Sequence, residues 1–143
     1  MDPFSSMDIS ASALSALRVR MNVIADNLAN VDTTRTREGG PYRKKEVVFG
    51  AVQDQSFADA LSGAAQATPG VQLLGIVQSQ TPPRRVLNPS HPDADAQGFV
   101  LMPDINPLIE MVDMLSATRA YEANVTAIQS WKTMTNKALE IGR

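Results

Sequence analysis

The chain has 143 residues, of which 43% are hydrophobic, and a formal net charge of −2. It contains no cysteine, which excludes disulfides, thiolate nucleophiles and cysteine-based zinc sites. The small net charge does not favour nucleic acid or an anionic membrane as a partner, and no apolar run approaches the ~20 residues of a membrane-spanning helix. Alanine supplies 18 of the hydrophobic residues and only seven are aromatic, so the composition favours slender, closely packed helices over a bulky core.

The N-terminal sequence "MDPFSSMDIS" lacks the features of a Sec signal peptide. Its first ten residues carry no lysine or arginine, and the first cation is Arg18. No apolar segment of the length that such a signal needs follows it. We therefore expect no cleaved signal of this type.

Residues 7–31 repeat apolar side chains at heptad spacing, which predicts a long amphipathic helix. Asp8 is the predicted N-cap, and Asn30 with Asp32 and Thr33 is the predicted stop. Alternating steps of three and four join the seam residues Met7, Ser10, Leu14, Leu17, Met21, Ile24, Leu28 and Val31.

The central part of the chain, residues 35–104, has a different pattern that predicts β structure. Glycine and proline at 39–41 predict a turn, and strands are expected at the end of 39–50, at 71–77 with a possible bulge at Gly75, and at 99–103. Residues 56–70 are small, polar and glycine-bearing, which is typical of a flexible linker. The proline-rich stretch 81–98 is predicted to be a stiff, extended connection.

A second long helix is predicted within residues 105–143. Asn106 is a good N-cap, Pro107 suits the first helical position, and Glu110 favours the positive end of the helix dipole. Heptad steps again connect Met111, Met114, Thr118, Tyr121, Val125, Ile128, Lys132, Thr135 and Leu139.

The predicted fold class is therefore α+β, with two long heptad helices forming a coiled-coil-like stalk and a small central β region. The predicted segments are 1–34, 35–104 and 105–143, and the last helix is expected to pair with the first. The seams are longer than the β region could cover, which favours packing between several chains over a two-helix core within a monomer. The predicted assembly residues are Leu14, Leu17, Met21, Ile24, Leu28, Val31, Met111, Met114, Tyr121, Val125, Ile128 and Leu139.

The sequence "HPDADAQGFV" (91–100) holds the only histidine, His91, followed by Asp93 and Asp95. A zinc or iron site needs three or four converging ligands, and neither a second histidine nor a cysteine completes the set. The neighbouring residues are turn formers whose side chains usually bond their own backbone. We interpret this stretch as a polar turn, and predict no catalytic residue, cofactor or metal.

A cluster of basic residues precedes the first predicted strand. Glu38 and Glu46 interrupt it, and only Tyr42 offers an aromatic ring for stacking on a base. We interpret the cluster as a solvated or subunit-contacting surface and not as a nucleic-acid site. Its members are Arg35, Arg37, Arg43, Lys44 and Lys45.

Several stretches resemble a known family. "NVIADNLANVDTTRT" (22–36) resembles the A-N-x-x-T signature of bacterial flagellar rod and hook proteins, with the motif on Ala29, Asn30 and Thr33. "GGPYRKKEVVF", "PPRRVLNPSHPDADAQGFVLMPDIN" and "EMVDMLSATRAYEANVTAI" are similar, in order and over nearly the whole chain, to the proximal-rod members of that family. Leu87 departs from the pattern, which has an aromatic residue at that position.

The resemblance implies a structural subunit of the flagellar basal body, with no enzymatic activity. Such subunits assemble through their terminal helices into the hollow rod that spans the periplasm, transmits motor torque and encloses the export channel. The implied partners are other rod proteins, copies of the same chain and the flagellar type III export apparatus, which exports its substrates without a cleaved signal. Neither nucleic acid nor membrane insertion is implied.

Heptads alone leave two other classes of protein open. A secreted coiled-coil adaptor or chaperone-like protein has similar helical seams. A small enzyme is less favoured, because the sequence offers no catalytic constellation.

Overall fold

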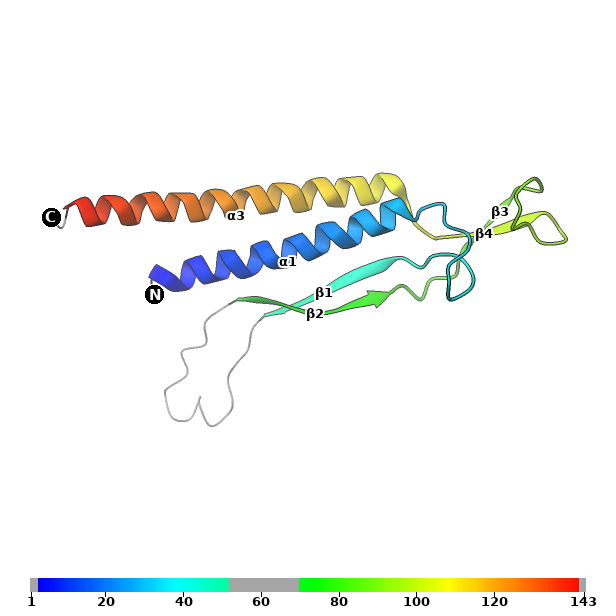
Figure 1. The fold of residues 1–143 in the computed structure, drawn as a ribbon, viewed down its shortest axis with the longest axis horizontal. Coiled ribbons are helices and arrows are strands. Elements are labelled where there is room, and N and C mark those ends of the chain that lie inside the picture. The colour runs from blue at the N-terminus through cyan, green and yellow to red at the C-terminus, as the bar shows by residue number, and fades with distance from the viewer. Residues whose placement is uncertain (1–2, 52–69, 142–143) are drawn as a thin grey trace, which may run out of the picture. The chain divides into compact units, whose positions relative to one another are not determined.

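The computed structural model describes residues 3–51 and 70–141. The predicted α+β class is confirmed: along the sequence, a long N-terminal helix and a long C-terminal helix enclose a small β region made of two two-stranded sheets (Figure 1). Most of the predicted linker, residues 56–69, lies outside the described residues. The elements are α1 (Pro3–Ala29), β1 (Lys45–Ala51), β2 (Val71–Gln78), β3 (Arg84–Leu87), β4 (Phe99–Met102) and α3 (Pro107–Ile141).

Helix α1 begins earlier than predicted. Its first residue is Pro3, so the prediction of Asp8 as N-cap was wrong. Proline suits this first position because the first backbone N–H groups of a helix have no intrahelical acceptor. The predicted stop is confirmed: α1 ends at Ala29, and the N–H of Asn30 still reaches the carbonyl oxygen of Asp26 at 3.1 Å.

Helix α3 begins where the sequence predicted. Asn106 is the N-cap, because its Oδ1 accepts a hydrogen bond from the N–H of Leu108 at 3.0 Å, and Pro107 is the first helical residue. Within residues 3–51 and 70–141, neither this helix nor α1 is long and apolar enough to cross a membrane.

The β region contains one strand more than predicted. β1 pairs with β2, and β3 pairs antiparallel with β4 in a register that places Val86 opposite Val100. The prediction that 81–98 is a single extended connection was therefore wrong. The run 84–87 lies between prolines and contains none, so its N–H groups remain available for a ladder.

The loop between β3 and β4 is closed by its own polar groups. Asn88 donates its N–H to the carbonyl oxygen of Gly98 at 2.9 Å, and the N–H of Asp93 donates to Nδ1 of His91 at 3.1 Å. These bonds confirm the prediction of a polar turn at His91.

Asp95 organises the second half of this loop. Its Oδ1 accepts the N–H groups of Phe99 at 2.8 Å and Gln97 at 2.9 Å, while Oδ2 lies 3.4 Å from the guanidinium of Arg85. The pKa of Asp95 is lowered, chiefly by the hydrogen bond from Phe99, with Gln97 and Arg85 adding to it. The carboxylate therefore favours the closed loop above about pH 4, the ordinary pKa of aspartate.

Gly98 closes this hairpin loop with a backbone φ of +79°, and a Cβ there would lie 3.0 Å from Cγ of Pro89. We expect Gly98→Ala to lower the free energy of unfolding by about 1–2 kcal/mol, because an L side chain is strained in the left-handed region. Gly75→Ala is the matched control, since a Cβ at Gly75 meets nothing within 4 Å. Urea unfolding followed by circular dichroism measures both, and equal losses would contradict the role given to Gly98.

Internal contacts divide the chain into two compact units, which we describe separately. Unit 1 contains residues 1–19, 48–75 and 117–143, and unit 2 contains 20–47 and 76–116. The proposed division at residues 34 and 104 follows the order of elements along the chain and stays a prediction.

Unit 1 is held by small side chains and local hydrogen bonds. Ala16 and Ala117 are buried, which is the close-packing role that the alanine content predicted. Ser12 donates its hydroxyl to the carbonyl oxygen of Ile9 and accepts the N–H of Val71 at 3.1 Å, which ties β2 to α1. The two strands also pack closely, because a Cβ at Gly50 would lie 2.9 Å from the side chain of Leu74.

Candidate assembly surface and its polar junction

Unit 2 contains two features with functional potential. The first is a buried polar cluster, called here the junction, formed by Asn27, Tyr42, Lys44, Lys45 and Glu110. The second is an exposed apolar surface in the first turns of α3, called here the strip, formed by Leu108, Ile109, Met111, Val112 and Leu115.

Asn27, on the last turn of α1, is the centre of the junction and is completely buried. Its Nδ2 donates to the carbonyl oxygen of Lys45 at 2.9 Å and to Oε2 of Glu110 at 3.2 Å. Its Oδ1 accepts the N–H of Lys45 at 2.9 Å and the hydroxyl of Tyr42 at 3.1 Å. Both amide hydrogens and two oxygen lone pairs are therefore used, as burial of an amide requires.

Glu110, in the first turn of α3, is a buried charge with 2% of its surface exposed. Nζ of Lys44 lies 2.9 Å from Oε1. Among the described residues Oε1 meets no other hydrogen-bond donor, so this oxygen depends on its ion pair with Lys44. An uncompensated buried carboxylate is costly, and removing one partner of such a pair typically costs about 3–5 kcal/mol.

The surroundings of Lys44 and Tyr42 in the junction favour the protonated forms of these two side chains. The side-chain hydrogen bond to Glu110 raises the pKa of Lys44 above its ordinary value, although burial of the ammonium opposes this shift. Burial also raises the pKa of Tyr42, and the charges of Asp26 and Glu110 raise it further. Both groups therefore bind their proton more tightly in the folded chain than in the unfolded chain.

We expect the folded chain to lose stability as the pH rises above about 10, near the unfolded pKa values of these groups. Below that pH the contributions of Lys44 and Tyr42 are fully present, and they are lost as each group deprotonates through its raised folded pKa. Tyr42→Phe removes the tyrosine contribution, so its urea midpoint should fall less between pH 9 and pH 11 than that of the wild type. Equal falls in the urea midpoint of the two proteins would contradict the raised pKa of Tyr42.

Sequence reasoning misjudged part of this cluster. Lys44 was interpreted as part of a solvated or subunit-contacting surface, but it is half-buried against Glu110 inside its own chain. For Glu110, the sequence predicted only a favourable interaction with the positive end of the helix dipole. Asn27 was missed, and the available signal was its amide on the helix face that otherwise carries the apolar residues Val23 and Ile24.

The three arginines of the basic cluster are exposed to solvent, as predicted. Arg35, Arg37 and Arg43 are exposed, and Arg35 lies 4.0 Å from the carboxylate of Asp93. Lys45 is half-buried and lies 3.9 Å from Asp26. The three arginines therefore form an exposed, charged surface.

The strip lies on the side of α3 opposite Glu110, as the helical repeat of 3.6 residues requires. Exposed fractions are 70% for Leu108 and 56% for Val112, and the other members are each 53% exposed. Further along α3 the same face carries polar residues such as Arg119 and Glu122, which are exposed. The strip is therefore a discrete apolar surface of about two turns.

The predicted assembly residues fall into three groups by exposure. Ile24 is buried, and Met111 and Leu139 are exposed, at 53% and 68%. The half-buried residues are Leu14, Leu17, Met21, Leu28, Val31, Met114, Tyr121, Val125 and Ile128. Their part in contacts between chains stays a prediction.

Two of the three motif residues form the exit from α1. Asn30 donates Nδ2 to the carbonyl oxygen of Asp26 at 2.8 Å, and its Oδ1 accepts the hydroxyl of Thr33 at 3.1 Å. The N–H of Thr33 also reaches the carbonyl oxygen of Asn30 at 3.1 Å. The spacing of the motif therefore ends the helix and turns the chain, while Ala29 is exposed.

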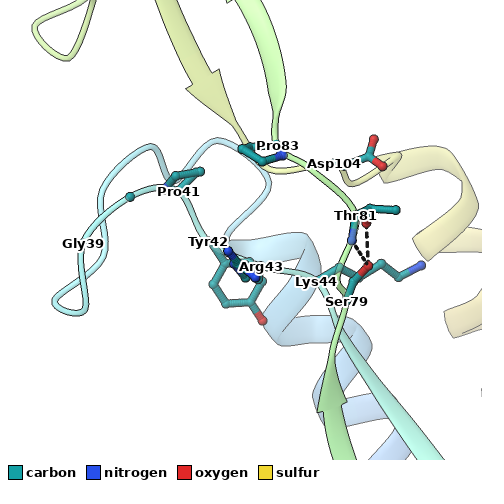
Figure 2. A pocket seen from close by; sticks show the side chains of 10 residues that line it. Gly39, Pro41, Tyr42, Arg43, Lys44, Ser79, Thr81, Pro83 and Asp104 are labelled. Carbon is teal, nitrogen blue, oxygen red and sulfur yellow. Dashed lines mark hydrogen bonds between the residues drawn. The ribbon is translucent and has the colours of Figure 1, made fainter.

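A small polar pocket lies beside the junction (Figure 2). Its hydroxyls are engaged locally: Ser79 bonds Thr81, and the N–H of Ser79 donates to the carbonyl oxygen of Lys44 at 2.8 Å. These bonds make a turn at the end of β2 and hold the backbone of Lys44. The pocket is lined by Gly39, Gly40, Pro41, Tyr42, Arg43, Lys44, Ser79, Thr81, Pro83 and Asp104.

Within residues 3–51 and 70–141, no three histidine, cysteine, aspartate or glutamate side chains gather in a metal-ligating group. The acidic residues near His91 have structural partners instead. Asp93 accepts the hydroxyl of Thr34 at 2.7 Å, and Asp95 holds the hairpin loop.

Two family models match the helical parts of this chain. Residues 7–35 match the family described as flagella basal body rod protein, and residues 96–141 match the C-terminal family of the flagellar basal body rod FlgEFG proteins. The two matches cover nearly all of α1 and α3 and the exit motif. The class is therefore that of the flagellar basal-body rod proteins.

Relatives that match nearly the whole chain identify the family within this class. The flagellar basal-body rod protein FlgC of Bacillus subtilis is 46% identical over 151 aligned residues that cover 100% of both chains. FlgC of Salmonella typhimurium is 43% identical with 95% of each chain covered, and FlgC of Aquifex aeolicus is 36% identical over 98% of this chain and 97% of its own. The chain belongs to the FlgC family of flagellar basal-body rod proteins.

Proposed function

We propose that the chain is a structural subunit of the flagellar proximal rod. In this role it packs with other rod proteins and with copies of itself, reaches its site through the flagellar type III export apparatus without a cleaved signal, and lies in the part of the basal body that spans the periplasm. The assembled helices enclose the export channel and transmit motor torque. The role requires no catalysis.

The observation that carries this proposal is the strip. Contiguous apolar side chains that are each more than half exposed are typical of interaction surfaces. Leu108, Met111, Val112 and Leu115 have the heptad spacing that suits another helix. The opposite face of α3 already holds the junction, so one helix serves both the fold of its chain and a contact with a neighbour.

The proposed role also requires stiffness. Torque transfer needs many shared contacts between rigid elements, and close-packed helices supply them. In our proposal the seam residues of the segments 1–34 and 105–143 add contacts in the assembled rod, while segment 35–104 packs against the helices.

Complementation of a deletion strain tests this function. Cells that lack the gene should be non-motile and carry neither hooks nor filaments, and wild-type protein should restore both. Swimming in soft agar and filament counts by electron microscopy are the measurements. Motile, flagellated deletion cells would contradict the proposal and favour the secreted adaptor.

A further inference from the structure

We propose that Asn27, Lys44 and Glu110 fix the register in which α1 pairs with α3. This inference deepens the proposed function and rests on it, because a subunit that assembles through its helices must present them at one axial offset. The contact itself is direct, since Nδ2 of Asn27 donates to Oε2 of Glu110 at 3.2 Å.

The apolar pattern does not fix this register by itself. Leu14, Met21 and Leu28 recur every seven residues on α1, and Met114, Tyr121 and Ile128 do so on α3. A slip of one heptad therefore places apolar residues against apolar residues again. In such repeating seams a buried polar residue is the usual device that selects one register.

A slip would break up the junction. Moving α3 by seven residues displaces Glu110 by about 10 Å along α1. The backbone of Lys44 is held at its original position, because its carbonyl oxygen accepts the N–H of Ser79 at 2.8 Å. The moved carboxylate would lie near the level of Arg20, which is exposed and one heptad before Asn27, while Asn27 and Lys44 would both lose their partner.

The junction ties a third segment into the same register. Asn27 bonds both the N–H and the carbonyl oxygen of Lys45, each at 2.9 Å, as a neighbouring strand would. Lys45 is the first residue of β1, so α1, β1 and α3 meet at one layer. A helix that lacks a carboxylate or amide at the position of Glu110 cannot complete this layer.

A distance measurement on the full chain tests the inference. The natural chain has no cysteine, so Asn22→Cys and Ile109→Cys, both at exposed positions outside the junction, accept spin labels without background. Pulsed electron paramagnetic resonance should give a single distance between the two labels when the junction is unchanged. Lys44→Met with Glu110→Met keeps the volume but removes the polar layer, and should add a second population displaced by up to about 10 Å.

Two further variants sharpen the test. Lys44→Met with Glu110→Gln keeps an acceptor for Asn27 and should retain the single distance. Arg20→Gln removes the cation that a slip would bring to Glu110 and should also leave the distance unchanged. Circular dichroism reports helix content in each case.

Three results would overturn the inference. The double methionine variant could show only the wild-type distance between the labels, or it could lose its helix content. The chain with the natural junction could itself show a broad distribution of distances. The labels report on the free chain in solution, so this experiment succeeds or fails independently of rod assembly and of the complementation test.

Discussion

Asn27→Asp should strongly destabilise the fold, although it changes one side-chain atom. The new carboxylate cannot donate, so the hydrogen bonds to the carbonyl oxygen of Lys45 and to Oε2 of Glu110 are both lost. It also places a second negative charge beside a buried one. We expect a loss of about 3–5 kcal/mol in the free energy of unfolding, which is a large share of the 5–15 kcal/mol of a typical domain.

Asn22→Asp is the control for this prediction. Asn22 lies on the same helix but is exposed, so its substitution should change stability by no more than about 0.5 kcal/mol. Urea unfolding followed by circular dichroism at 222 nm compares the two variants. Similar midpoints would show that the junction contributes little to folding.

Val112→Asp should abolish rod assembly and leave the fold of the chain intact. Val112 is 56% exposed in the centre of the strip, so the carboxylate is solvated in the free chain but would be desolvated in a contact between subunits. We expect wild-type thermal unfolding and no filaments on deletion cells that express the variant.

Gln129→Asp is the matched control on the same helix. Gln129 is exposed on the polar continuation of that face, so its carboxylate should remain in water. Cells with this variant should swim. Filaments on Val112→Asp cells would show that the strip is not buried in the rod.

The positions of the long elements could be predicted from the sequence because they depend on local patterns. Heptad spacing marked both helices, and Asn106 and Asn30 marked the start of α3 and the end of α1 through bonds to nearby backbone. The start of α1 was misplaced because Asp8 is a good cap, yet Pro3 can open the helix.

The junction could not be predicted because its contacts join residues far apart in the chain. Asn27 and Glu110 are 83 positions apart, and heptad spacing does not identify which opposing residue each will meet. The strand β3 was missed for a related reason, since its ladder depends on β4 across the loop at 88–98. Local signals had marked that stretch only as rich in proline and turns.

The reactivity of Val112→Cys shows whether the first turns of α3 are buried in the assembled rod. This chain has no natural cysteine, so the introduced thiol is its only site for a maleimide reagent. We expect rapid labelling of the free chain and labelling slower by about tenfold or more in purified hook–basal bodies, because thiol reactivity depends on access. Equal labelling rates in both samples would contradict this expectation.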